Sequence, residues 1–368
     1  MEKIKVLYFI DRMRHGGIQQ FAVEIVKNMD KKKCEIDFLL LDDGQTYPLE
    51  NVLKELGVKF YKLKGVWFRT PFDILKQKRA LENFFKEHHD YKVVHMHSSS
   101  KNFMVLKIAK KYGINIRIAH SHNIGFQSKN KIKILIGDLL KKPLKKYATH
   151  YFSCSKLAGK WLFGKEEVEI IHNAVDYEKF KFNQRRRDEL RKELEIENCL
   201  VIGNVGRFTN QKNHTFLVDI FNEIHKQNEN AVLMLVGIGE KEQEIRDKIE
   251  KFGLTDCVKF MGFCNNTNEL FWCMDIFLLP SLHERLPVVG VEAQCTGLPC
   301  FMSKDVITEE AKIVENVKFI ELEKTPEEWA EIILSSDLNR RDTYEELKNA
   351  GYFIEQTVER LERFYREV

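Results

Sequence analysis

Two glutamates eight positions apart, Glu284 and Glu292, are the residues of this chain whose type and spacing first suggest chemistry. The apolar run 276–279 before them predicts a buried parallel strand, and Pro287 opens a helical pattern that ends at Gly297. Because the first amides of a helix lack partners and carry partial positive charge, this arrangement predicts an anion site. Carboxylates are stable beside a diphosphate only if they accept hydrogen bonds from hydroxyls, which indicates a nucleotide sugar. Two solvated glutamates on a surface helix are the alternative.

Two cations, Arg207 and Lys212, stand between a predicted strand at 200–205 and a predicted helix that begins at His214. A lysine supplies a point charge, and the planar guanidinium of an arginine can bind two oxygens at once. The pair therefore predicts a clamp for a phosphate group. An ordinary exposed basic loop is the alternative.

Glycine pairs follow two further predicted strands. Gly16 and Gly17 lie between a strand at 3–10 and a helix at 18–29, and they allow the backbone to approach a ligand closely. A turn without chemical role is the alternative there. Gly237 and Gly239 form a second glycine pair after the strand at 231–237, which by itself is weak support for nucleotide binding.

Strand and helix patterns alternate through both halves of the chain, which predicts parallel sheets with helices on both faces and ligands at the carboxyl ends of the strands. Histidines close two of these strands. His95 and His97 end one, and His120 and His122 follow the next, where we expect them on opposite sides of a turn. Clustered histidines bind metals in other proteins, but no carboxylate accompanies these at useful spacing, so no metal site is predicted.

The segment P-S-x-x-E-x-L-P-x-V-x-x-E-A-x-x-x-G-x-P, residues 280–299, resembles the signature of glycosyltransferase family 4. These are retaining enzymes of the GT-B fold. The resemblance implies two Rossmann-like, doubly wound domains that face each other across a cleft, with a C-terminal helix that crosses back to the first domain. Arg285 departs from the pattern, because family members usually carry glycine there, next to the transferred sugar. The identity of the donor sugar is therefore open.

The resemblance also implies a role for each matching residue. Arg207 and Lys212 would bind the donor diphosphate and stabilise the departing charge, and Glu284 would orient the sugar hydroxyls. Glu292 would hold the ribose. His122 would position the transferred sugar, with His120 as its rival. The other donor-binding positions that it implies are Gly16, Gly17, Gly237, Phe263, Leu286 and Val288.

A chain of 368 residues is longer than a single hydrophobic core usually supports, so two domains are expected. We expect an acceptor-binding domain at 1–183, completed by 353–368, and a nucleotide-sugar-binding domain at 184–352, because a charged stretch after residue 183 is typical of a linker. Neither a signal peptide nor a membrane span is recognisable, so a cytoplasmic protein is expected. The eight cysteines are scattered and indicate neither disulfides nor a structural metal.

The net charge of +4 hides a local excess, since residues 101–165 contain 14 lysines and one arginine against one acid, a balance of 15 − 1 = +14. Within it, residues 127–146 combine apolar residues at helical spacing with surrounding lysines. This basic amphipathic segment predicts contact with an anionic membrane surface. A helix packed on its own domain with a solvated lysine face is the alternative. Nucleic acid is disfavoured, because the segment lacks interleaved aromatic residues.

These patterns together predict a retaining hexosyltransferase. It would move a hexose from a nucleoside diphosphate sugar, a UDP-sugar, to a hydroxyl of a lipid-linked saccharide in bacterial capsular or exopolysaccharide synthesis, at the inner face of the cell membrane. No Asp-x-Asp pair is present to carry a cation, so no metal or other cofactor is expected. Because no well-placed nucleophile is visible, front-face displacement is expected, with a covalent intermediate as the alternative. The alternatives are a GT-B nucleotide-sugar epimerase and a catalytically silent nucleotide-sugar binder or scaffold.

Overall fold

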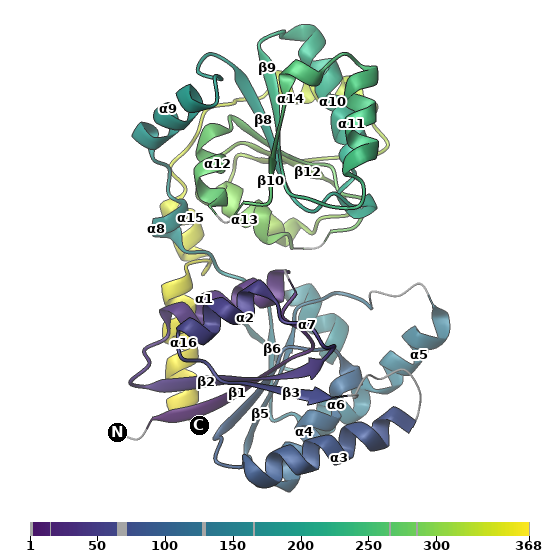
Figure 1. Cartoon of the computed structure of the whole chain (residues 1–368), viewed down its shortest axis with the longest axis vertical. Coiled ribbons are helices and arrows are strands. Elements are labelled where there is room, and N and C mark those ends of the chain that lie inside the picture. Colours follow the sequence, from purple (N-terminus) through teal and green to yellow (C-terminus); the bar gives the residue numbers. More distant parts are fainter. Residues whose placement is uncertain are drawn as a thin grey trace. The chain divides into compact units, whose positions relative to one another are not determined.

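A computed structural model describes residues 3–14, 16–64, 72–126, 130–164, 166–264, 266–284 and 286–367. The chain divides into two compact units, one of residues 1–174 with 354–368 and one of residues 175–353 (Figure 1). The division lies at 174/175, whereas the sequence suggested 183, because Val175 and Phe180 belong to the hydrophobic core of the second unit. Each unit is described by itself below.

The first unit contains a parallel sheet of seven strands in the order β3-β2-β1-β4-β5-β6-β7. The strands are β1 (Ile4–Ile10), β2 (Cys34–Asp42), β3 (Phe60–Lys64), β4 (Val93–Met96), β5 (Ile116–Ser121), β6 (His150–Ser153) and β7 (Glu169–Ile170). The chain order reverses between β1 and β4, and ligands of such sheets gather at the carboxyl ends of the strands beside that reversal.

Helices cover both faces of this sheet because alternate strand residues point to opposite sides. Val6, Tyr8 and Ile10 pack with α1 (Gly17–Asn28), α2 (Pro48–Glu55) and α16 (Ile354–Glu367). Leu7 and Phe9 pack with the helices of the other face. Those helices are α3 (Phe72–Glu87), α4 (Met104–Lys111), α6 (Lys141–Tyr147) and α7 (Lys156–Phe163), and the unit also contains η1 (Ser100–Asn102) and α5 (Lys131–Leu139).

The second unit contains a parallel sheet of six strands in the order β10-β9-β8-β11-β12-β13. The strands are β8 (Leu200–Val205), β9 (Ala231–Val236), β10 (Val258–Gly262), β11 (Ile276–Leu279), β12 (Cys300–Ser303) and β13 (Val317–Ile320). Here the chain order reverses between β8 and β11. The two loops that carry the predicted cations and Glu284 follow these two strands.

Two cores lie on opposite faces of the second sheet. One face is covered by α8 (Tyr177–Phe180), α9 (Gln184–Glu193), α12 (Thr267–Cys273), α13 (Val288–Cys295) and α15 (Tyr344–Asn349). The other is covered by α10 (His214–Gln227), α11 (Glu242–Lys251) and α14 (Pro326–Leu334). Short helices η2 (Asn210–Lys212), η3 (Thr255–Cys257) and η4 (Glu309–Ala311) complete the unit. Trp329 of α14 is fully buried in the core on this face.

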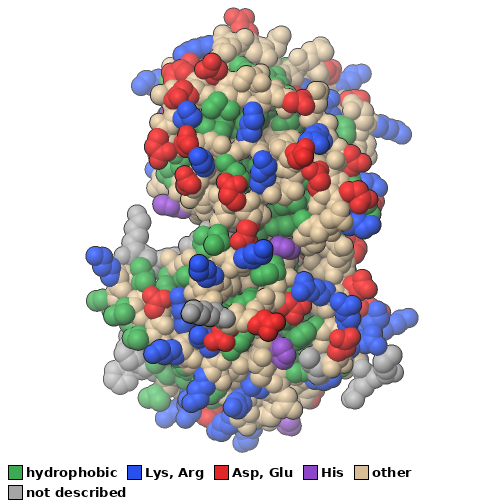
Figure 2. All heavy atoms as spheres, turned by 180° about the vertical axis from the view of Figure 1, so that it is seen from behind, with side chains coloured by type: hydrophobic (Ala, Val, Ile, Leu, Met, Phe, Trp, Pro, Cys, Tyr) green, Lys and Arg blue, Asp and Glu red, His purple; other side chains and the backbone are tan. Residues whose placement is uncertain are grey.

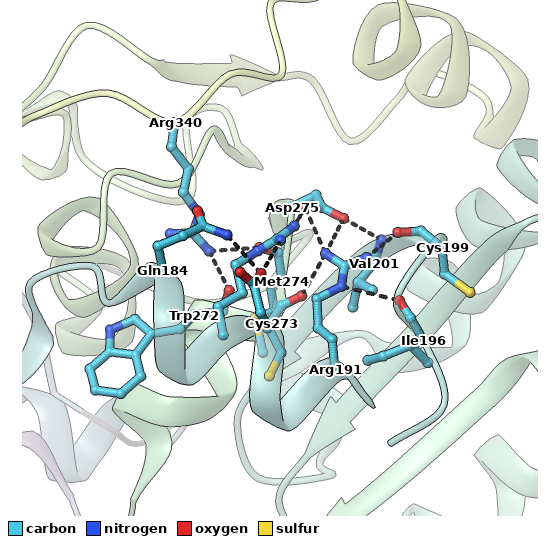
Figure 3. Close-up of polar contacts among 12 residues, drawn as sticks. Gln184, Arg191, Ile196, Cys199, Val201, Trp272, Cys273, Met274, Asp275 and Arg340 are labelled. Atoms are coloured by element: carbon cyan, nitrogen blue, oxygen red, sulfur yellow. Dashed lines mark hydrogen bonds and ion pairs between the residues drawn. The ribbon is translucent and has the colours of Figure 1, made fainter. Parts of the chain in front are cut away.

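Buried and partly buried charges anchor α9 and α12 to this sheet (Figure 3). Asp275 accepts hydrogen bonds from Arg191 Nη1 at 3.0 Å and from the Val201 amide at 2.9 Å. Arg340 donates to the carbonyls of Thr296, Phe271, Trp272 and Met274 at 2.6 to 3.0 Å. Three of these carbonyls lie at the end of α12, where helix carbonyls lack intrahelical partners. The guanidinium thus satisfies groups that burial would otherwise leave unpaired.

Candidate functional site

An ion pair joins two of the predicted donor-binding residues in the second unit. Lys212 Nζ lies 2.5 Å from Glu284 Oε2, and each side chain is only 14% exposed. Lys212 ends η2 after β8, and Glu284 follows β11. The two residues stand 72 positions apart, and they meet because β8 and β11 are neighbours at the chain reversal. The structure therefore brings together a cation and an acid that the sequence had assigned to one site.

Two hydrogen bonds hold the loops of this pair against each other. The Leu282 amide donates to Gln211 O at 2.8 Å, and Asn213 Nδ2 donates to Pro280 O at 3.1 Å. Asn213 has a φ of 55°, a left-handed conformation that asparagine tolerates better than most residues. The loops thus have a defined relative position before any ligand binds.

Glycines are required beneath this ion pair because backbone segments approach each other closely. A Cβ on Gly237, whose φ is +143°, would lie 2.1 Å from Gly206 O, and a Cβ on Gly239 would lie 2.3 Å from Phe208 O. The loop after β9 therefore packs directly on the loop after β8. The Lys212 side chain lies over Gly206, where a Cβ would come within 3.2 Å of it.

The remaining predicted residues of the second unit surround this centre at the carboxyl ends of the strands. Helix α13 begins at Val288, and its preceding residue Pro287 makes no side-chain cap to the first amides. Glu292 lies on the same helix and is partly exposed, while Arg207 and Phe263 are exposed in the loops after β8 and β10. Leu286 precedes α13 and packs partly against the core. The departure from the family pattern at Arg285 lies outside the described residues.

In the first unit, Gly17 begins α1 and Gly16 precedes it, both exposed at the end of the loop after β1. Asp11 lies at the start of the same loop and accepts hydrogen bonds from Ser98 Oγ at 2.5 Å and Asn102 Nδ2 at 2.8 Å. Burial raises the pKa of this carboxyl, against the opposing effect of these bonds. The sequence pattern did not single out Asp11, although its position after β1 was a signal.

The two candidate histidines lie on the same side of β5, and the expectation that a turn separates them is wrong. Their rings stack with centroids 4.0 Å apart, because residues two apart at a strand end face the same way. His120 is buried, whereas His122 is partly exposed and lies 3.3 Å from Asn173 Oδ1 through Nδ1. Burial lowers the pKa of His122 to about 4, so this imidazole is neutral at pH 7. Its position beside the surface fits the sugar-contacting role better than that of His120.

A hydrogen-bonded chain behind these histidines includes two residues that sequence reasoning missed. Tyr365 of α16 lies 2.9 Å from the Tyr8 hydroxyl and 2.7 Å from His95 Nδ1. Tyr365 lies on α16 directly after Phe364. The fully buried residue is Tyr365. The C-terminal helix thus reaches the histidines of the first unit.

The predicted amphipathic segment forms two helices, α5 and α6, from residue 131 onward, and residues 127–129 lie outside the described chain. Four apolar side chains of α5 face solvent: Ile132 is 68% exposed, Leu135 60%, Ile136 38% and Leu139 60%. The alternative of a helix packed by its apolar side on its own domain is therefore wrong for α5. Figure 1 shows this helix at the periphery of the first unit.

Helix α5 is attached to its unit mainly through one residue, Gly137, the only one of its residues that is buried. The ring of Phe126 lies where a Cβ on Gly137 would be, and Ser100 Oγ donates to Gly137 O at 2.7 Å. Hydrophobic and basic side chains lie side by side on the surface at this edge of the unit (Figure 2). No helix within the described ranges is both long and apolar enough to cross a membrane.

Comparison with known proteins gives matches over both units. The family model "Glycosyltransferase Family 4" matches residues 15–179, and the model "Glycosyl transferases group 1" matches residues 186–352. EpsF of Bacillus subtilis (strain 168) is 30% identical over 376 residues, which cover 98% of this chain and 96% of EpsF. The UDP-Gal:alpha-D-GlcNAc-diphosphoundecaprenol alpha-1,3-galactosyltransferase of Escherichia coli is 25% identical over 82% of this chain and 79% of that enzyme.

A solved structure of Anabaena HepE in complex with UDP and glucose resembles the whole chain. Its TM-score is 0.77 at 20% sequence identity, and the match covers 99% of this chain and 100% of HepE. At this identity the likeness concerns the fold alone. With the two parallel sheets described above, it confirms the expected GT-B fold.

Proposed function

We propose that this chain, which belongs to the glycosyltransferases of family 4, moves a hexose from a UDP-sugar to a hydroxyl of a lipid-linked saccharide and retains the anomeric configuration. The observation that carries the proposal is the Lys212–Glu284 ion pair, set on glycine-lined backbone beside the start of α13. Support for the donor comes from HepE, whose structure contains UDP and glucose, and support for the acceptor from the lipid-linked substrate in the name of the Escherichia coli relative.

The chemistry requires stabilisation of the leaving diphosphate. When the bond between the anomeric carbon and the diphosphate oxygen breaks, negative charge develops on the diphosphate and positive charge on the sugar. Arg207, Lys212 and the first amides of α13 would stabilise that negative charge, and donors that are already in place need no reorganisation during the reaction. Lys212 is well suited to this role, because Glu284 already holds it in position.

The acids and His122 would orient the sugar. Glu284 would accept hydrogen bonds from its hydroxyls, Glu292 would hold the ribose, and the neutral ring of His122 would contact the transferred hexose. We propose front-face displacement, in which the acceptor oxygen bonds to the anomeric carbon on the face that the diphosphate leaves. The hydroxyl proton then passes to the departing diphosphate oxygen. We further propose that no metal ion bridges the diphosphate, since two cationic side chains supply the positive charge.

The direct test is a panel of nucleotide sugars incubated with lipid-linked saccharides and scored by mass spectrometry for UDP release and for the lengthened acceptor. Nuclear magnetic resonance of the product then gives its anomeric configuration. We expect transfer from a UDP-hexose, unchanged by a chelator, and loss of transfer in Glu284→Gln. The matched control is Glu321→Gln, which removes an exposed glutamate paired with Lys304 in the same unit.

Three outcomes would contradict the proposal. Conversion of the UDP-sugar without an acceptor would indicate an epimerase, and donor binding without UDP release would indicate a silent binder. Activity that a chelator abolishes and magnesium restores would contradict the metal-independent chemistry.

We also propose that α5 and α6 bind the protein peripherally to an anionic membrane at its inner face. The apolar side chains of α5 would enter the lipid interface, and the surrounding lysines would contact acidic headgroups. Lys133, Lys142 and Lys146 are exposed and available for such contact, whereas Lys141 and Lys145 are hydrogen bonded to the carbonyls of Trp161 and Phe163. A membrane surface would bring the enzyme to a lipid-linked acceptor.

Vesicle flotation separates the two contributions. The double variant Leu135→Ser/Leu139→Ser should lose binding to phosphatidylglycerol vesicles, and Lys133→Glu/Lys142→Glu/Lys146→Glu should lose it in a salt-dependent manner. Leu75→Ser is the matched control, because Leu75 is a 58% exposed leucine on α3. Equal binding by the control and both α5–α6 variants would remove the membrane proposal and leave a solvated basic face.

A further inference from the structure

An acidic residue of the first unit, Asp11, lies where the chain order of the sheet reverses, and the transfer chemistry proposed above does not use it. It follows β1, and the side chains that bind it, Ser98 and Asn102, follow β4, which is the neighbour of β1 at the reversal. Ligands of doubly wound sheets bind at this point, outside the carboxyl ends of the strands. Asp11 is partly exposed there and can therefore meet a ligand.

The carboxyl group of Asp11 is held through one of its two oxygens. Oδ1 accepts hydrogen bonds from Ser98 Oγ at 2.5 Å and from Asn102 Nδ2 at 2.8 Å, whereas no residue that the structure describes donates to Oδ2. Each carboxylate oxygen has two lone pairs, so Oδ2 can accept further bonds. Burial raises the pKa of this group despite the two bonds and the nearby Arg12 and Lys101, which is typical of a carboxylate that is short of hydrogen-bond donors.

Further hydrogen bonds fix the position of this carboxyl group. Asn102 also donates to Ser98 Oγ at 2.7 Å and accepts from Gln77 Nε2 at 3.0 Å, and both Asn102 and Gln77 are buried. The Leu41 amide donates to the backbone carbonyl of Asp11 at 3.2 Å. Because the members of this network are bonded to one another, Asp11 is in place before a ligand arrives, as a binding residue requires.

A small cavity adjoins this network at Ser98. Its volume is about 20 Å³, enough for one hydroxyl group or water molecule, and His97 and His122 line it together with Ser98. The neutral ring of His122 donates from Nδ1 to Asn173 Oδ1 at 3.3 Å, so its Nε2 accepts from His97 Nδ1 at 2.9 Å. His97 Nε2 is then a lone pair, buried and without a partner among the described residues, and it can accept a hydrogen bond from a hydroxyl.

We propose that Asp11 binds the acceptor of the transfer reaction, with Oδ2 accepting a hydrogen bond from a hydroxyl of the acceptor saccharide. This role rests on the proposed function and names a residue that holds its second substrate. A carboxylate repels the donor diphosphate, whereas its hydrogen bond to an uncharged hydroxyl is charge-assisted and strong. The cavity would take a neighbouring hydroxyl of the same sugar beside His122, the residue proposed to contact the transferred hexose.

The place of Asp11 in the first unit suits an acceptor that is attached to a lipid. Helix η1 binds Asp11 through Asn102, and it binds α5 through Ser100, whose Oγ donates to Gly137 O at 2.7 Å. The exposed apolar side of α5 is the segment proposed to enter the membrane surface. One short helix thus connects Asp11 with the segment that would lie on the bilayer, where the lipid of the acceptor is anchored.

The test separates acceptor binding from donor binding. Initial rates are measured with the lipid-linked saccharide that wild type lengthens fastest in the panel of nucleotide sugars, and UDP binding is measured by isothermal titration calorimetry. Asp11→Asn keeps an oxygen for Ser98 and Asn102 but places an amide N–H where Oδ2 was. We expect its KM for the acceptor to rise by about 10- to 100-fold, because a hydrogen bond to a charged group is lost, while its Kd for UDP stays unchanged.

Asp90→Asn is the matched control, because Asp90 is an exposed aspartate that pairs with Lys5 and precedes β4, at the opposite end of the sheet. It should leave both constants unchanged. Thermal unfolding checks that each variant is folded. If Asp11→Asn does not fold, Ser98→Ala removes one of the bonds that position Asp11 and should raise the KM for the acceptor by about 2- to 10-fold.

The outcomes distinguish this role from the proposed function. With wild type active, an unchanged acceptor KM in Asp11→Asn, or in Ser98→Ala where only that variant folds, would overturn the role of Asp11 and leave the proposed function intact. Weaker UDP binding at an unchanged acceptor KM would overturn it as well, because Asp11 would then act on the donor. If wild type transferred hexose to no saccharide, the proposed function and the acceptor role would both be wrong.

Discussion

The two units are built on the same doubly wound plan but place different chemistry at the ends of their strands. In the second unit, the loops after β8 and β11 carry an ion pair, Lys212 with Glu284. A second pair, buried Arg191 with partly exposed Asp275, holds α9 at the end of the sheet where β8 and β11 begin. In the first unit, the ends of β4 and β5 carry neutral histidines that are hydrogen bonded to one another and to Tyr365.

The shared fold determines where ligands bind in each unit. The few residues at the strand ends determine which kind of ligand binds there. Charged groups prepared in advance suit a diphosphate, whose charge increases as the bond breaks. Neutral, buried imidazoles suit uncharged hydroxyls. Four predictions, in order of decreasing expected effect, test whether the second unit depends on charge and the first on neutral polar contacts.

The largest effect is expected for Asp275→Asn in the second unit. The variant keeps the size of the side chain but leaves the guanidinium of Arg191, which is 3% exposed, without its counter-charge. Removing one partner of a buried pair costs about 3 to 5 kcal/mol, and the free energy of unfolding should fall by that amount in urea denaturation. Glu189→Gln, which breaks an exposed pair with Arg185, should cost less than about 0.5 kcal/mol. Similar losses in the two variants would contradict the role of buried charge.

Lys212→Met should lower kcat for hexose transfer by about 10²- to 10³-fold, because it removes a preorganised cation from the leaving group. The fold should persist, since the loops are also held by Asn213 and Gln211. Lys226→Met is the matched control, as Lys226 also pairs with a glutamate, Glu223, at 2.6 Å but on an exposed helix face. If the kcat of Lys212→Met were unchanged, the positive charge of Lys212 would contribute to stability and not to catalysis.

His214 is a buried, neutral histidine of the second unit, and it should make the stability of the protein depend on pH. Burial, with a smaller contribution from Lys212, lowers its pKa from 6.5 to about 3. Below pH 6.5 the unfolded chain binds a proton that the folded chain does not, so stability falls as the pH decreases. Between about pH 7.5 and 5.0 this amounts to about 2 kcal/mol, which His214→Phe should remove. Because each protein is compared with itself at the two pH values, any change in packing that the substitution causes cancels. If wild type and His214→Phe showed the same dependence of stability on pH, the effect would not come from His214.

The smallest effect is expected for Tyr365→Phe in the first unit, about 1 to 2 kcal/mol of the free energy of unfolding. The variant keeps the buried ring and removes only the hydroxyl that lies between Tyr8 and His95. Denaturation in urea at pH 7.5 measures the loss beside that of Asp275→Asn. If Tyr365→Phe lost as much free energy of unfolding as Asp275→Asn, the proposed difference between the two units would be wrong.

Much of the fold and part of the candidate site could be predicted from the sequence. Alternating strand and helix patterns predicted the parallel sheets, and the family signature predicted the GT-B fold. The order of residues after each strand also predicted that Lys212 and Glu284 would belong to one site, because parallel strands end at the same edge of a sheet. Their assignment to donor binding stays a prediction. These features depend on local periodicity and on chain order, which the sequence contains directly.

Other features were decided only by the tertiary structure. The exposure of the apolar side of α5 could not be predicted, since a helical pattern shows which residues share a face but not what covers that face. The contact of Tyr365 with His95, 270 positions away, depends on how the last helix packs. The meeting of the histidines was open as well, because strand-end register and the neighbouring strand decide which rings touch. Such contacts join distant parts of the chain, and only packing in three dimensions selects them.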